Sequence, residues 1–264
     1  MCIIALNWQP GRPLTLTIAA NRDESRACLT LGLHHWPVQG ILAGPDLQAS
    51  GTRLGLSAGE GTHQIRMAAL TNYRDVTSQR PDTVSRGYLT AAFMNSSVSA
   101  KGYLQKLSAN THFFNPFNLI VFDGQTLMDF DCRHARIYEL PAGMTGVSNA
   151  DFNTYRPKLE YLRISFEQTL ADHDDEALLQ EIFFKLLFDD RITPVATLSK
   201  KGISLNRERV LSAAMMYTPD YGTRAFSVIR IKHQGAQFTK RCFDTNGFKG
   251  EAKENTAWGN PCLP

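Results

Sequence analysis

The chain has 264 residues, of which 43% are hydrophobic and 20% are charged, and its formal net charge is +3. This length and apolar content suffice for a large core, in one big domain or two small ones. The small net charge provides no strong field for holding nucleic acid or an anionic membrane, so neither is expected as a partner.

The first residues, MCIIALNWQPGRP, carry no basic residue before a short apolar run that ends at Pro10. This pattern predicts neither a signal peptide nor a transmembrane segment, and no other stretch approaches the length of a membrane span. The five cysteines are scattered, without the CxxC spacing of a zinc site. We therefore expect a cytoplasmic protein without a metal centre.

The first half of the chain begins with two β-favouring runs, 2–8 and 14–20, joined by the turn-forming segment QPGRP, which predicts a hairpin. A glycine-rich stretch around 51–61 indicates short paired strands, and a further strand is expected at 66–71. Apolar residues at three- and four-residue spacing then predict helices over 83–94 and 101–107. An antiparallel meander follows, with strands at 117–122, 125–131 and 136–140.

The second half returns to helical periodicity. Pro157 can occupy the first helical position, and Leu159, Leu162, Phe166 and Leu170 mark one face of a helix. Helices at about 175–187 and 207–215 and strands at 224–231 and 237–243 complete the order, and 247–264 is expected to be an irregular tail. This order predicts one α+β domain over 1–264, with antiparallel strands and helices on their outer faces.

Cys2 is the first candidate for chemistry. Removal of the initiator methionine would give this residue a free α-amine beside its thiol, so that one residue supplies both nucleophile and base. The simpler interpretation is a small apolar residue that begins a buried strand, which is the commonest role of a cysteine.

The run Asn21-Arg22-Asp23-Glu24 directly follows the second strand. In a hairpin, the end of the second strand lies beside the start of the first, so Arg22 and Asp23 are expected close to Cys2. A nearby guanidinium would favour the reactive thiolate. The alternative is that these four polar residues are a solvated strand end.

Five motifs occur in register along the chain: MC at 1–2, NRDE at 21–24, ALTNYR at 69–74, GVSN at 146–149 and YGTR at 221–224. Together they resemble the NRDE family, also called the Transport and Golgi Organization 2 family. One departure is at Arg53, in SGTRLG at 50–55, where the family is expected to carry tryptophan. The resemblance implies a four-layer αββα sandwich of two antiparallel sheets covered by helices, similar to N-terminal-nucleophile hydrolases.

That scaffold resembles N-terminal-cysteine amidases such as penicillin V acylases, which implies a set of roles for the motif residues. Cys2 would be the nucleophile, Asp23 would accept a hydrogen bond from its α-amine, and Arg22 and Arg224 would surround the thiol with positive charge. Asn149, together with Asn72, would donate to the oxyanion. Both asparagines could instead brace turns.

The family resemblance also implies haem trafficking, which is the interpretation we favour, with haem as the transported ligand and haem donor or acceptor proteins as partners. The alternative is hydrolysis of a small linear or cyclic amide, which needs no cofactor. A third hypothesis is a structural interaction module, although no amphipathic or charge-patterned helix supports it. The candidate haem ligands are Cys2, His34, His35, His63, His112 and His134.

Overall fold

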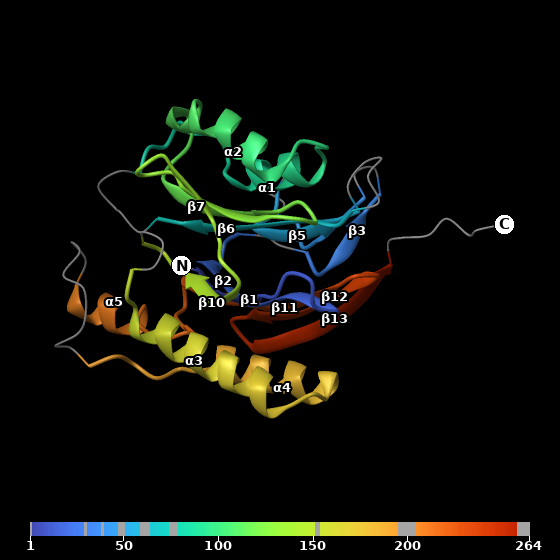
Figure 1. Ribbon diagram of the computed structural model, residues 1–264. Coiled ribbons are helices and arrows are strands. Elements are labelled where there is room, and N and C mark those ends of the chain that lie inside the picture. The colour runs from blue at the N-terminus through green and yellow to red at the C-terminus, as the bar shows by residue number, and fades with distance from the viewer. Residues whose placement is uncertain are drawn as a thin grey trace.

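The computed structural model describes residues 2–28, 31–37, 40–46, 51–58, 64–73, 79–150, 154–194 and 204–257. These residues form two antiparallel sheets and five α-helices, which confirms the predicted α+β class. The sheets face each other, and helices cover the outer face of each (Figure 1).

The six-stranded sheet contains both ends of the described chain. Its strands, in spatial order, are β10 (Gly143–Val147), β1 (Cys2–Trp8), β2 (Leu14–Ser25), β11 (Tyr221–Lys232), β12 (Gly235–Asp244) and β13 (Gly247–Ala257). The predicted β1–β2 hairpin is confirmed, and Cys2 lies directly opposite Arg22 in its register.

The seven-stranded sheet is a continuous meander in which spatial order follows chain order. Its strands are β3 (His34–Trp36), β4 (Ile41–Ala43), β5 (Leu54–Ser57), β6 (Arg66–Asn72), β7 (Phe117–Phe122), β8 (Leu127–Asp131) and β9 (Arg136–Glu139). Short strands were expected in the glycine-rich stretch, and β4 and β5 pair there across 41–57.

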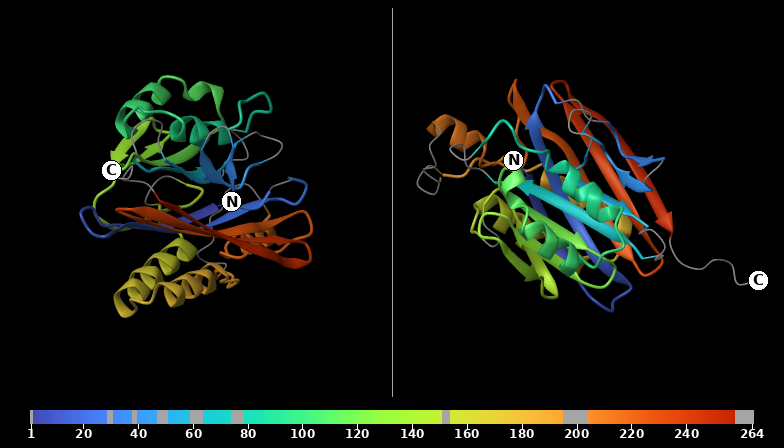
Figure 2. Two further views of the ribbon diagram at one scale, coloured as in Figure 1. Left: turned by 90° about the vertical axis from the view of Figure 1, so that its right-hand side faces the viewer. Right: turned by 90° about the horizontal axis from the view of Figure 1, so that it is seen from above.

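Two helices lie on each sheet. The seven-stranded sheet is covered by α1 (Gly87–Met94) and α2 (Ala100–Ser108), and the six-stranded sheet by α3 (Pro157–Asp172) and α4 (Glu176–Leu187), as Figures 1 and 2 show. The short helix α5 (Leu205–Val210) lies beside α3, and a single 3₁₀ turn spans Thr111–Phe113. Pro157 does begin α3, whose buried residues include Leu159, Leu162 and Phe166.

Three apolar clusters hold these layers together. One fills the space between the sheets and includes Leu6, Ile18 and Ile120. The second lies between the seven-stranded sheet and α1–α2, and the third between the six-stranded sheet and α3–α4. Burial of apolar area on both faces of each sheet is what stabilises a layered fold of this kind.

The tail prediction was wrong for residues 247–257, which form the edge strand β13. This strand has no large apolar face. Its inward-facing residues are Gly250, Ala252, Glu254 and Thr256, which alternate with exposed residues. The two-residue period of the strand is therefore carried by mostly small or polar side chains. Ala252 packs against the core between the sheets.

Two helices are shorter than expected. The predicted helix over 83–94 begins only at Gly87, and before it the Val84 N–H donates to the Phe113 carbonyl. The helix expected over 207–215 ends at Val210, because the N–H groups of Ala214 and Met215 both donate to the Asp189 carbonyl. Long-range hydrogen bonds therefore set the end of α5.

Candidate functional site

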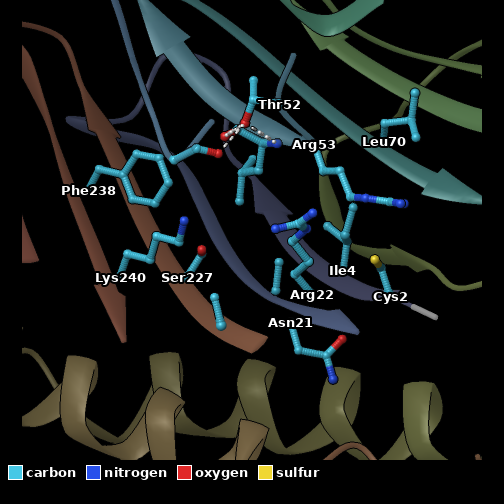
Figure 3. A pocket seen from close by; sticks show the side chains of 14 residues that line it. Cys2, Ile4, Asn21, Arg22, Thr52, Arg53, Leu70, Ser227, Phe238 and Lys240 are labelled. Carbon is cyan, nitrogen blue, oxygen red and sulfur yellow. Dashed lines mark hydrogen bonds between the residues drawn. The ribbon is translucent and has the colours of Figure 1, made fainter. Parts of the chain in front are cut away.

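Cys2 begins β1 with its side chain directed between the two sheets. The residue is 3% exposed, and its thiol faces a cavity that it shares with Arg22 and Arg53 (Figure 3). Because residues opposite each other in an antiparallel pair present their side chains on the same face, the pairing of Cys2 with Arg22 places the guanidinium on the thiol side.

Asn21 and Asp23 flank Arg22 and therefore face the opposite side of the sheet. The Asn21 Oδ1 accepts a hydrogen bond from the Ile3 N–H at 2.8 Å, and its Nδ2 donates to the Ala214 carbonyl at 2.5 Å. The Asp23 Oδ1 accepts from the Thr223 hydroxyl at 2.7 Å, and burial raises the pKa of this carboxyl group. These contacts hold the end of β2 against β1 and β11, beside Cys2.

Asn149 lies in the segment after β10, and its side chain contacts Cys2 directly. The Cys2 N–H donates to the Asn149 Oδ1 at 2.9 Å, and the Asn149 Nδ2 donates to the Asn72 carbonyl at 2.5 Å. Asn149 thus bridges the two sheets at the start of β1. The Asn72 Oδ1 has no hydrogen-bond partner among the described residues, and Asn72 lines a second, larger cavity.

Two ion pairs surround the cavity of Cys2. Arg22 pairs with Asp46 at 2.8 Å, and Arg53 pairs with Glu24. Burial, followed by the charge of Arg53, lowers the pKa of Arg22. Burial alone would raise the pKa of Glu24, but Arg53 and Arg22 outweigh it and hold that pKa below its ordinary value. Glu24 is therefore an ionised partner of these arginines at neutral pH.

The site comprises two adjoining cavities. The cavity at Cys2 has a volume of about 30 Å³, and the neighbouring one, which reaches Asn72 and Arg86, has a volume of about 240 Å³. Their linings share Thr52, Arg53 and Leu70. Arg22 and Arg53 line the cavity of Cys2, and Arg53 and Arg86 line the neighbouring cavity.

The structure brings five of the six predicted site residues to the start of β1: Cys2, Arg22, Asp23, Asn72 and Asn149. Arg224 lies apart from them. Its side chain donates to the Arg26 carbonyl at 3.4 Å, and it lines neither of the two cavities. Its predicted role beside the thiol stays a prediction.

The cations Arg53, Arg86 and Lys240 line the two cavities and were not assigned from the sequence. Arg53 could have been found from its position in the SGTRLG motif, where it replaces the expected aromatic residue. Arg86 had no comparable signal, because it reaches the site only through the packing of the segment before α1.

The described candidate haem ligands other than Cys2 lie outside both cavities. The His34 Nδ1 lies 3.0 Å from the Gly32 carbonyl oxygen, and the His134 Nδ1 lies 2.8 Å from the Asp131 carboxylate. His112 stacks on Phe113. His63 lies outside the described residues.

No helix within the described ranges is both long enough and apolar enough to cross a membrane.

The family model described as Transport and Golgi organisation 2 matches residues 1–243. The chain is 32% identical to the Transport and Golgi organization protein 2 homolog of Bos taurus, and the alignment covers 91% of this chain and 92% of the relative. The corresponding homologs of Mus musculus and Homo sapiens are 31% and 30% identical, with the same coverage. The chain therefore belongs to the Transport and Golgi organisation 2 family.

Proposed function

We propose that this protein is an N-terminal-cysteine hydrolase of small amides, built on a scaffold similar to that of N-terminal-nucleophile hydrolases. The observation that carries the proposal is the placement of Cys2. Its thiol faces a cavity beside two guanidiniums, while its backbone nitrogen is held by Asn149 on the other side of the strand end.

Removal of Met1 would convert the Cys2 nitrogen into an α-amine. In acylation, the thiol proton passes to this amine while sulfur attacks the amide carbon and forms a C–S bond. The amine then gives the proton to the leaving nitrogen as the C–N bond breaks. Water next attacks the thioester carbon and gives one proton to the α-amine; the C–S bond breaks, the acid is released, and the amine passes that proton to sulfur. Arg22 and Arg53 favour the thiolate form throughout.

The two asparagines then have different roles. Asn149 is a positioning residue, because its Oδ1 and Nδ2 already bond Cys2 and the Asn72 carbonyl. Asn72 is the better candidate for the oxyanion donor, because Asn149 binds its backbone carbonyl and not its side-chain amide, and the residue lines the larger cavity. Asp23, buried behind the same strand end, would hold the α-amine by charge.

Haem transfer receives less support from the geometry. A cavity of about 240 Å³ is smaller than the pockets of about 300–1,000 Å³ that typically hold drug-sized ligands. The described histidines also lie away from it. The haem-trafficking role and its donor or acceptor proteins therefore stay a prediction from the family resemblance. A cytoplasmic location is part of the proposal, supported by the free thiols of the four described cysteines.

The test combines intact mass with trapping of the acyl-enzyme. Processed protein treated with p-nitrophenyl acetate should acquire one acetyl group on residue 2, and Cys2→Ala should lose both the adduct and amide hydrolysis, by roughly a thousandfold or more. Cys242→Ala is the matched control and should retain both. Retention of Met1 in protein purified from its native host would exclude the mechanism.

A further inference from the structure

Arg86 lines the larger cavity and has no carboxylate partner among the described residues. It directly precedes α1, and the one hydrogen bond that its side chain makes to a described residue is from Nη1 to the Pro116 carbonyl at 3.2 Å. Burial, followed by the charge of Arg53, lowers the pKa of Arg86 to about 10, so the group is still a cation at neutral pH. A charge held in this way is costly unless an anion compensates it.

The neighbouring charges do not supply that anion. Asp46 is engaged by Arg22, and Glu24 is engaged by Arg53. Among the described residues that line the joined cavities, the cations Arg22, Arg53, Arg86 and Lys240 outnumber the carboxylates of Glu24 and Asp46. An anion bound at Arg86 would reduce this excess of positive charge.

The remaining lining suits a carboxylate. A guanidinium presents two parallel N–H groups that match the two oxygens of a carboxylate, and such charge-assisted pairs are stronger than neutral hydrogen bonds. The hydroxyl-bearing residues Thr83 and Ser85 and the amide Asn72 line the same cavity. Its volume of about 240 Å³ restricts the ligand to a small group.

We propose that the larger cavity binds the carboxylate of a small N-acyl amino acid, with Arg86 as its anchor and the amide carbonyl directed past Arg53 toward Cys2. The identity of the reacting bond rests on the proposed hydrolase function. Binding of the carboxylate does not, because it requires Arg86 and not a reactive thiol.

The test measures binding to the processed Cys2→Ala protein, which leaves the amide intact. N-acetylglycine and its neutral analogue N-acetylglycinamide serve as probes, and affinity is measured by NMR titration. The acid should bind saturably, and the amide about tenfold or more weakly. Arg86→Gln should weaken binding of the acid about 10- to 100-fold, whereas Arg86→Lys should retain part of it.

Arg12→Gln is the matched control, because Arg12 lies in the exposed turn between β1 and β2 and the substitution removes the same charge. It should leave the affinity unchanged. Equal affinity for acid and amide, no saturable binding, or an equal effect of Arg12→Gln and Arg86→Gln would each overturn the carboxylate site. Tighter binding of inorganic phosphate than of N-acetylglycine would also overturn it.

The two proposals fail separately. Arg86-dependent binding without any acyl adduct on the wild-type protein would remove the nucleophile and leave the carboxylate site. Conversely, a Cys2 adduct combined with equal affinity for acid and amide would remove the carboxylate site alone.

Discussion

Asp129, in the middle of β8, offers a test of the folded structure that does not depend on function. The residue is 0% exposed, and neither carboxyl oxygen has a hydrogen-bond partner among the described residues. Burial, reinforced by the charge of Asp131, raises the pKa of Asp129 well above its ordinary value. The folded protein therefore holds this group protonated at a pH where the unfolded chain releases the proton.

The sign of the pH dependence follows from that difference. Below about pH 4 both states are protonated and Asp129 has no effect on the pH dependence. Between the unfolded pKa and the raised folded pKa, unfolding releases a proton, so the free energy of unfolding falls by about 1.4 kcal/mol for each pH unit. The Asp129→Asn variant has no proton to release at this position, so its free energy of unfolding does not fall with pH for this reason.

Urea unfolding of the wild type and Asp129→Asn at pH 5, 6 and 7 measures the effect. The variant should gain stability relative to the wild type as pH rises, by about 1.4 kcal/mol per unit while the pH lies between the two pKa values. A difference that does not change with pH would refute the conclusion that the carboxyl group is buried in its neutral form.

Asp123→Asn is the matched control with the opposite sign. Burial alone would raise the pKa of Asp123, but hydrogen bonds from the N–H groups of Ala100 and Thr126 outweigh it and lower that pKa. The ionised Asp123 carboxylate stabilises the folded protein above the pKa that this group has in the unfolded chain, and this stabilisation is lost on acidification. The variant should be less stable than the wild type at pH 7, and the difference should shrink as the pH falls below about 4.

Two further predictions concern the frame of the site. Asn149→Leu removes both bonds that join Cys2 to Asn72 and should lower the free energy of unfolding by about 2–4 kcal/mol, measured by urea unfolding; an unchanged stability would contradict the bridging role. Gly51→Ala would place a Cβ 2.3 Å from the Gly87 carbonyl carbon and should destabilise the protein and weaken N-acetylglycine binding, whereas Gly32→Ala, with open space around its Cβ, should do neither.

The sequence was most informative where the relevant contact is local. The hairpin from Cys2 to Arg22 could be predicted because its two strands are joined by a short turn, and the register then follows from alternation along the strands. The contact between Cys2 and Asn149 spans 147 positions and was reached through family resemblance alone. No periodicity within either segment encodes it.

Arg86 and β13 show two different limits of prediction from the sequence. Arg86 lies just before α1 and lines the larger cavity, and the helical pattern of 83–94 does not indicate that the helix begins only at Gly87. The strand β13 pairs along its whole length with β12, and this backbone pairing needs no apolar signature in the sequence.

The order Asn21-Arg22-Asp23 has a geometric meaning that links fold and chemistry. Side chains alternate between the two faces of a strand, so the middle residue lies on the face of the Cys2 thiol and the outer two on the opposite face. Arg22 therefore acts on the sulfur, while Asn21 holds the backbone of Ile3 and Asp23 lies behind the strand end. A one-residue slip of β2 against β1 would exchange these faces and place a carboxylate beside the thiol. The hydrogen bonds of Asn21 to both Ile3 and Ala214 oppose that slip, so the same residue that fixes the register also fixes the charge around Cys2.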